Sequence, residues 1–161
     1  EVSNFALPGK RSQHNLGYWR LAPYLGIGPG ASSTLSGASW PIRIQASERL
    51  PTPEYQTELI SNEEFLLEHL MMGLRTSDGV HRKKLLDIFG VDPFDRGAGH
   101  GSGQNLSGAH QCLESGLIEL TDETIRATRK GRQLLDTVLA HLATDLQHVT
   151  PQFCNWPTAD K

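Results

Sequence analysis

The sequence predicts an α+β fold in which strands come first and helices follow. Residues 1–50 contain an alternating stretch at 41–45 and several glycines, and no apolar repeat of helical period. Beyond about residue 60, apolar residues recur every three or four positions, which is typical of helices with one buried face. A chain of 161 residues can bury a core in one domain, or hold one compact domain with an appendage.

A boundary is predicted at residues 50–54, where Thr52 can cap a short helix with Pro53 in its first turn. A longer helix is predicted to begin after Ser61, which has capping-box spacing to Glu64, and to end near Arg75. Its expected buried stripe consists of Phe65, Leu66, Leu70 and Leu74, with Leu67 and Met71 beside them.

Two further helices are predicted over residues 81–89 and 102–115, ended by Gly90 and Gly116. Glycine suits both ends because it adopts the left-handed conformation that closes a helix. The glycine-rich stretch at 97–103 is expected to be a flexible loop between these helices, with anion binding as the alternative.

Two short strands, 117–120 and 124–127, are predicted to form a hairpin, followed by a last helix. The order helix, helix, helix, hairpin, helix is that of a winged-helix domain, placed here at 51–146, and residues 147–161 are expected to be a loosely docked tail. The last helix carries Leu134, Leu135, Val138, Leu139, Leu142 and Leu146.

The hexapeptide HNLGYW at residues 14–19 combines a metal ligand, an amide and two large aromatic rings. The imidazole of His14 is a common kind of axial ligand for heme iron, and Tyr18 and Trp19 offer flat apolar surfaces with polar tips. Asn15 adds a hydrogen-bonding group. The alternative is structural: the end of a strand whose aromatic side chains seal a core.

The order of short motifs along the chain resembles a known family. The motifs are EVSNFA at 1–6, Pro-Gly at 8–9, HNLGYW, and YLGIGPGA at 24–31, with further matches at 65–75 and from 116 to 131. Over about residues 1–145 the chain resembles the C-terminal part of radical S-adenosylmethionine (SAM) proteins related to oxygen-independent coproporphyrinogen III oxidase (HemN/HemW). The HNxxYW pattern is similar to the heme-chaperone branch.

This resemblance implies a position for the first 50 residues, as the C-terminal strands of an incomplete radical SAM (β/α) barrel. It also implies that the glycine-rich strand end lies near the SAM pocket, although a strand end packed tightly on its neighbours is an equal alternative. Ser32 departs from the family, which usually has histidine there. The implied residues are His14, Asn15, Tyr18 and Trp19 for heme, with His14 as the metal ligand, and Gly26, Ile27, Gly28 and Ala31 for the cofactor.

The cysteines do not match the family's cluster motif. Family members hold a [4Fe-4S] cluster with a Cys-x-x-x-Cys-x-x-Cys motif, whereas this chain has only Cys112 and Cys154. The first residue is not Met, and we expect the chain to be the C-terminal part of a longer protein that uses the cluster and SAM. By itself the chain is not expected to be an enzyme. Cys112 is predicted to be a small buried filler.

Three functions remain open from the sequence. The first is heme binding and trafficking by the longer protein. The second is oxidative decarboxylation of coproporphyrinogen III, in porphyrin biosynthesis. The third is a lid or partner-docking module with no ligand of its own.

Charge and hydropathy narrow the partners. The net charge of −3 is mild, and residues 97–125 contain no Lys or Arg, so the helix that would enter a DNA groove lacks phosphate-binding groups and nucleic acid is not expected. No apolar run approaches the length of a membrane span and no signal peptide is visible, so a cytoplasmic location is expected. Most histidines other than His14 are expected at surface or rim positions, and His69 lies next to the apolar stripe of its helix.

Overall fold

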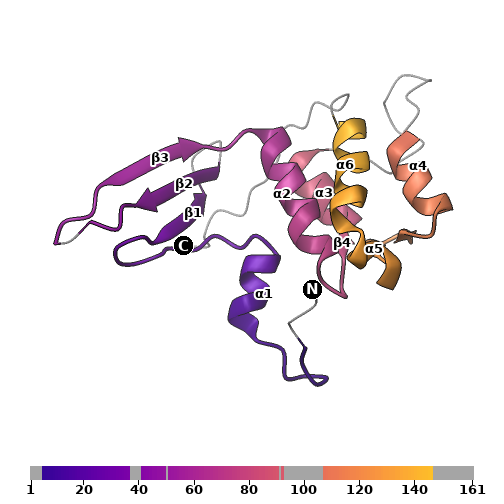
Figure 1. The fold of residues 1–161 in the computed structure, drawn as a ribbon, viewed down its shortest axis with the longest axis horizontal. Coiled ribbons are helices and arrows are strands. Elements are labelled where there is room, and N and C mark those ends of the chain that lie inside the picture. The colour runs from indigo at the N-terminus through magenta and orange to yellow at the C-terminus, as the bar shows by residue number, and fades with distance from the viewer. Residues whose placement is uncertain (1–4, 37–40, 50, 91, 93–106, 147–161) are drawn as a thin grey trace.

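The computed structural model describes residues 5–36, 41–49, 51–90, 92 and 107–146, and it confirms a mixed α+β architecture (Figure 1). A short helix, α1 (Gln13–Trp19), precedes an antiparallel sheet, and a helical part with a second small sheet follows. The glycine-rich stretch at 97–103, the predicted helix start at 102–106, Cys154 and the predicted tail at 147–161 lie outside the described residues.

The first sheet has the strand order β1-β2-β3, formed by β1 (Ser32–Ser36), β2 (Pro41–Ala46) and β3 (Tyr55–Leu59). The alternating stretch at 41–45 is therefore a strand, as predicted. All its pairings are antiparallel, so the described strands form a meander and show no parallel barrel strands. The sheet extends away from the helical part (Figure 1).

The short helix predicted after Thr52 is wrong. Residues 51–54 contain no helix, and the chain runs directly into β3. The connection from β2 is closed by Ser47, whose backbone N–H donates to the Glu54 carbonyl at 2.8 Å and whose hydroxyl accepts from the Glu54 N–H at 2.9 Å. Pairing with β2 thus overrides the local capping signal of Thr52 and Pro53.

The first 50 residues also contain a helix that the sequence patterns did not predict. The HNLGYW motif lies on α1, and none of the α1 residues is buried. The alternative that these aromatic residues seal a core at a strand end is therefore wrong.

The helical part begins with α2 (Asn62–Leu74), as predicted. The Ser61 hydroxyl accepts from the Glu64 N–H at 3.2 Å, and the predicted apolar stripe is buried. Next come β4 (Val80–His81) and α3 (Arg82–Phe89), which ends at Gly90 with φ 67°. The predicted helix end at Gly90 is confirmed.

The hairpin is also confirmed. After α4 (Ser107–Glu114) come β5 (Ile118–Leu120) and β6 (Thr124–Ala127), and β4 joins them in a sheet of order β4-β6-β5.

The single last helix is instead two, α5 (Arg129–Gln133) and α6 (Leu135–Leu146). The break falls at Leu134, whose φ of −117° is not helical. A Cβ at Gly131 would overlap the Leu117 carbonyl oxygen, so this glycine lets α5 cross close to the start of the hairpin.

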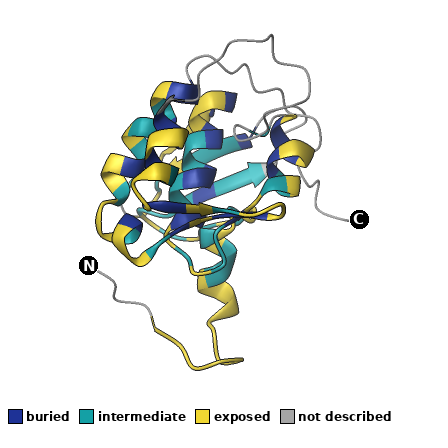
Figure 2. Cartoon of the chain, turned by 90° about the vertical axis from the view of Figure 1, so that its right-hand side faces the viewer, coloured by how far each residue is buried: buried dark blue, intermediate teal, exposed yellow. Residues whose placement is uncertain are grey.

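One apolar core joins the helices to the second sheet (Figure 2). Cys112 belongs to it, as predicted. His69 is an exception to the surface or rim positions expected for most histidines, because it is 4% exposed and its ring lies 5.9 Å from that of Phe89. Within the described residues, its Nδ1 has no hydrogen-bond partner. Burial, with a smaller contribution from the nearby charge of Lys84, lowers the pKa of His69 to about 3.

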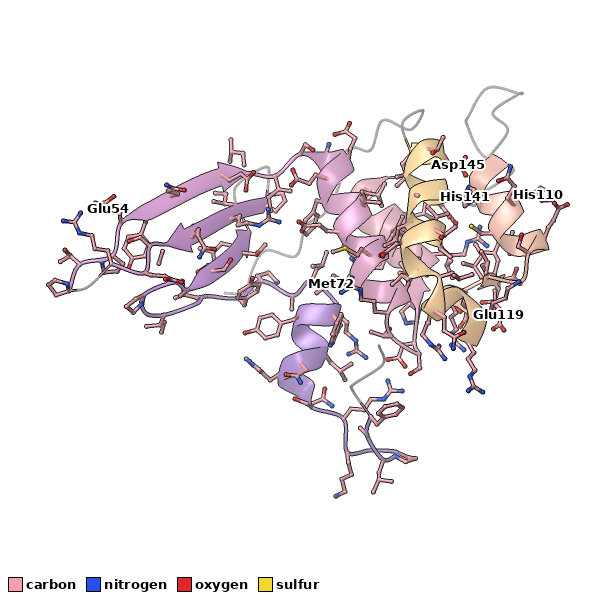
Figure 3. The ribbon with its side chains drawn as sticks, viewed as in Figure 1. Glu54, Met72, His110, Glu119, His141 and Asp145 are labelled. Atoms are coloured by element: carbon pink, nitrogen blue, oxygen red, sulfur yellow. The ribbon has the colours of Figure 1, made fainter. Side chains whose placement is uncertain are left out.

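A buried carboxylate begins α4. Asp145 on α6 is 5% exposed, and its oxygens accept from the N–H groups of Gly108 at 3.1 Å and Ala109 at 2.7 Å. Figure 3 shows Asp145 on the part of α6 that lies beside α4. The first N–H groups of a helix have no hydrogen-bond acceptor within the helix. Asp145, from a distant point in the chain, provides the acceptor oxygens for two of them.

Replacing Asp145 with alanine is expected to lower the free energy of unfolding by about 2 kcal/mol, because two buried N–H groups lose their acceptor. The matched control is Asp136→Ala, which removes an exposed carboxylate from the same helix and should cost less than about 0.5 kcal/mol. Urea unfolding followed by circular dichroism measures both. Equal losses in the two variants would contradict the capping role.

His69 is expected to make the protein less stable in acid. The unfolded chain takes up a proton at this site near pH 6.5 and the folded protein only near 3, so stability falls as the pH drops through this window. Within this window, the free energy of unfolding that depends on His69 falls by up to about 1.4 kcal/mol per pH unit. In urea unfolding at pH 7, 6, 5 and 4, the free energy of unfolding should therefore fall less steeply with decreasing pH for His69→Leu than for the wild type. The exposed control His81→Gln should keep the wild-type slope.

Candidate functional site

The HNLGYW motif is presented on the surface by α1. The Ser12 hydroxyl begins this helix by accepting from the Asn15 N–H at 3.3 Å, and the Ser12 carbonyl accepts from Leu16 at 3.0 Å. Ser12 was a signal in the sequence that could have revealed the helix, because serine is a preferred N-cap residue.

Two residues predicted for heme binding, His14 and Tyr18, form part of an aromatic row. The ring centroids of His14 and Tyr18 are 4.9 Å apart, and those of Tyr18 and Tyr24 are 4.8 Å apart, both in edge-to-face geometry. His14 is exposed, and Tyr18 is 36% exposed. The row consists of His14, Tyr18 and Tyr24, and it leaves the imidazole accessible at its outer end.

Tyr24 was not among the residues predicted for the site, yet it fixes the row to the sheet. Its N–H donates to the Thr34 carbonyl at 2.8 Å, and its carbonyl accepts from the Thr34 N–H at 3.0 Å. Asn15 and Trp19 are also four residues apart, so they share a neighbouring face of α1. Asn15 is exposed and Trp19 is half-buried. The structure thus places all four predicted heme-binding residues on one short helix.

The chain leaves α1 through a strained residue. Leu21 has φ 51°, in the left-handed region that normally favours glycine. The Ala22 N–H donates to the Gly17 carbonyl at 2.9 Å, and the Leu21 N–H to Tyr18 at 3.0 Å, which is the bonding of a Schellman motif. Leu21 packs against the apolar core of the helical part, and this contact offsets the strain.

Two arginines that flank α1 converge on one carboxylate. Arg11 binds Asp78 through two contacts, of 2.6 and 2.7 Å, and Arg20 binds it at 3.3 Å. We call Arg11, Asp78 and Arg20 the arginine clamp. The hydrogen bond from Arg11 holds the pKa of Asp78 below its usual range, with Arg20 adding to the effect. The Lys84 ammonium donates to the Arg20 carbonyl at 2.7 Å.

The turn after α2 sets the position of Asp78. The Thr76 hydroxyl donates to the Gly73 carbonyl at 2.8 Å and accepts from the Gly79 N–H at 3.2 Å. Gly79 has φ 72°, and a Cβ there would overlap the Ile125 carbonyl oxygen of β6. Only glycine therefore lets this turn lie against β6 and direct Asp78 toward α1.

The residues predicted for the cofactor lie beside β1, next to Tyr24. Gly26 donates its N–H to the Ser33 hydroxyl at 3.0 Å, and a Cβ there would overlap the Ser32 carbonyl oxygen. Gly28 has φ 109°, and no atom lies within 4 Å of where its Cβ would be. Ile27 is 90% exposed. Gly26 is thus packed on its neighbour, whereas Gly28 and Ile27 are open to an incoming group.

Ala31 and Ser32 join this segment to the sheet. The Ala31 carbonyl accepts from the Ala46 N–H at 2.8 Å, and Ser32 pairs with Gln45. Both residues are half-buried.

A cavity of about 300 Å³ lies elsewhere, between α4 and α6. His141 lies on the side of α6 that faces α4 (Figure 3). Burial raises the pKa of the Cys112 thiol at this cavity, and Asp145 adds to the effect, so the reactive thiolate is disfavoured. No group of three or more metal-ligating side chains occurs among the described residues. The cavity is lined by Gln111, Cys112, Glu114, Ser115, Leu117 and His141.

In the part of the chain that the structure describes, no helix is long and apolar enough to span a bilayer.

Comparison with known proteins gives one family match, to the HemN C-terminal domain over residues 60–134. Radical S-adenosyl methionine domain-containing protein 1, mitochondrial, of Bos taurus is 30% identical over 175 residues, covering 94% of this chain and 36% of that protein. Heme chaperone HemW of Bacillus subtilis is 28% identical over 152 residues, covering 91% of this chain and 38% of that protein. Heme chaperone HemW of Lactococcus lactis is 36% identical over 93 residues, covering 55% of this chain and 24% of that protein.

The chain thus spans little more than a third of the length of the first two relatives. No solved structure gave a significant match. The resemblance based on the short motifs is confirmed: residues 60–134 match the HemN C-terminal domain, and the chain is a HemN/HemW-like fragment, similar to the C-terminal part of these relatives.

Proposed function

We propose that this chain contributes the heme-binding element of a heme chaperone, with α1 as that element and heme as its cargo. The observation that carries the proposal is the accessible imidazole of His14 at the outer end of the aromatic row, on a helix with no buried residue. A helix whose rings are held in order but left uncovered is suited to accept a flat ligand. Two of the relatives reported above are named heme chaperones.

Each predicted residue has a distinct role in this proposal. His14 is the axial ligand, since neutral imidazole is a common ligand for heme iron. The ring of Tyr18, 4.9 Å from that of His14, restricts the orientation of the imidazole. Tyr18 and Trp19 pack near the porphyrin, and the Asn15 amide hydrogen-bonds at its edge.

For the whole protein we propose radical SAM chemistry, with a [4Fe-4S] cluster and SAM bound mainly outside this chain. The two cysteines of the chain do not fit a cluster that needs three thiolates from one short motif. The segment from Gly26 to Ala31 fits SAM better, because the open surroundings of Gly28 let a ligand approach the backbone. Its residues Gly26, Ile27, Gly28 and Ala31 are the cofactor-binding set in this proposal.

We further propose a winged-helix arrangement for the helical part. The order α2-β4-α3-α4-β5-β6, with a sheet of order β4-β6-β5, supports it. In a DNA-binding winged helix, α4 would be the helix that enters the major groove. The described helix α4 contains neither Lys nor Arg, so duplex DNA is not the proposed partner.

Replacing His14 with alanine is expected to abolish the Soret shift that heme undergoes on binding, or to weaken heme binding at least about tenfold, because the iron loses its axial ligand. Heme titrations of the wild type and His14→Ala provide the test, with His110→Ala as the control for loss of an exposed histidine. An unchanged affinity and Soret maximum in His14→Ala would rule out His14 as the ligand.

The chain by itself is expected to assemble no stoichiometric [4Fe-4S] cluster and to cleave no SAM after anaerobic reconstitution, because it has two cysteines far apart in sequence. Iron and sulfide analysis, together with detection of 5′-deoxyadenosine under reducing conditions, provides the measurement. About four irons per chain, or production of 5′-deoxyadenosine, would show that the chain contains its own radical SAM centre.

A further inference from the structure

The two edges of the first sheet differ in how the chain covers them. At the β1 edge, Tyr24 and Thr34 exchange two backbone hydrogen bonds, of 2.8 and 3.0 Å, so a further piece of chain lies along that edge. At the β3 edge, no further strand is paired among the described residues, and every residue of β3 is exposed. Figure 1 shows β3 along the border of the sheet, which extends away from the described helices.

The backbone of β3 directs a row of hydrogen-bonding groups outward. At the two ends of the strand, the Ser47 N–H donates to the Glu54 carbonyl at 2.8 Å, and the Ile60 N–H donates to the Pro41 carbonyl at 3.2 Å. Every second residue of an antiparallel strand bonds to the same neighbour, and the register with β2 is continuous. The even-numbered residues therefore bond to β2, and the odd-numbered ones direct their N–H and C=O groups away from it. These odd-numbered residues are Tyr55, Thr57 and Leu59.

This edge lacks the features that usually protect an edge strand. The sequence of β3, YQTEL, contains neither Pro nor Lys, and its continuous register has no bulge. The side chains of Tyr55 and Leu59 are 66% and 68% exposed. The charge of Glu58 is partly compensated by Arg43 at 3.4 Å. The edge is therefore suited to pair with another strand of low charge.

The sequence of β3 is complementary to a second copy of itself. Two β3 strands can run antiparallel with Thr57 opposite its own copy. In this register Tyr55 lies opposite Leu59 of the second copy, an aromatic ring against an aliphatic side chain. Gln56 lies opposite Glu58, an amide donor against a carboxylate. Such cross-strand pairs are favourable, and each opposed pair of outward residues can exchange two backbone hydrogen bonds.

Charge selects this register over its neighbours. The nearest alternatives differ by two residues, because the outward groups alternate along the strand. A shift in one direction places Glu58 directly opposite its own copy, and a shift in the other places it opposite Glu54 of the second copy. Like charges directly opposite each other destabilise a strand pair. A shifted pair also leaves part of each edge unpaired and open to further strands.

We propose that β3 is the contact of a symmetric dimer of this chain, in which two β3 strands pair antiparallel about Thr57 and join two three-stranded sheets into one. The interface is isologous, because a two-fold axis through the Thr57 pair makes every other contact occur twice. The dimer leaves α1 and its aromatic row outside the contact, so this inference does not depend on heme binding.

A substitution at the centre of the pair tests the contact. Thr57→Pro removes an N–H group that faces outward, so the hydrogen bonds between β3 and β2 are kept. Thr57→Val is the matched control, since it retains the N–H and the branched side chain. Sedimentation velocity over a range of concentrations of the full chain measures the dissociation constant, and circular dichroism confirms that each variant is folded.

The wild type and Thr57→Val are expected to form dimers with similar dissociation constants. For Thr57→Pro the dissociation constant should rise at least about tenfold, because the lost donor occurs twice in the symmetric pair. A wild type that stays monomeric at every concentration contradicts the proposal. Equal dimerisation of wild type and Thr57→Pro places the contact elsewhere.

Cysteine cross-linking tests the register, and it remains informative if Thr57→Pro does not fold. The variants are Thr57→Cys and Arg49→Cys, both combined with Cys154→Ser. In the proposed pair the two Thr57 Cα atoms are about 5.5 Å apart, which suits a disulfide. Arg49 is exposed in the β2–β3 connection, and its two copies would lie at opposite ends of the pair.

Mild oxidation should therefore give a covalent dimer with Thr57→Cys and none with Arg49→Cys. Equal cross-linking at the two positions, or none at Thr57→Cys, overturns the register. The same cross-linking is repeated in the longer protein that the sequence predicts. If the chain alone cross-links through Thr57→Cys but the longer protein does not, another part of that protein covers β3 and the dimer is not its native state.

Discussion

The arginine clamp is the interaction on which the placement of α1 depends. A helix of seven residues is not stable in isolation, and α1 has no buried residue to dock it. Asp78 adds to the apolar contact of Leu21 by binding both Arg11, which precedes the helix, and Arg20, which follows it. The hydrogen bonds from the arginines lower the pKa of Asp78 below its usual acidic range, so the clamp weakens only in acid, as the pH falls through that lowered value.

Elements with strong local signals were predicted correctly from the sequence. The cap at Ser61 and the apolar stripe of α2 lie within one stretch of chain, and so does the glycine that ends α3. The failures occurred where distant contacts decide the structure. Thr52 and Pro53 suggest a helix start, but pairing with β2 makes the following residues a strand. The last helix is broken at Leu134, three residues after Gly131 crosses close to Leu117 at the start of the hairpin, a distant contact that no local pattern reveals.

The candidate site was predictable only in part, for the same physical reason. The HNLGYW motif identified His14 and Tyr18, but α1 itself was missed because seven residues are too few for an apolar period and its end has Leu21 in place of glycine. Tyr24 and Asp78 come from other elements, so no spacing along the chain connects them to α1. The burial of His69 was not predicted because it depends on packing with other elements, including Phe89 of α3, whose ring lies 5.9 Å away.

The uncovered strand β3 has a consequence for the behaviour of the chain in solution. All five of its residues are exposed, and among the described strands it pairs only with β2. Its outer row of N–H and C=O groups is a template for an added strand, and Tyr55 and Leu59 give that edge an apolar character. Glu58 is its only charged residue, and Arg43 partly neutralises it at 3.4 Å. Edge-to-edge aggregation is therefore the intrinsic liability of this chain, and it grows with ionic strength as the remaining repulsion between Glu58 carboxylates is screened.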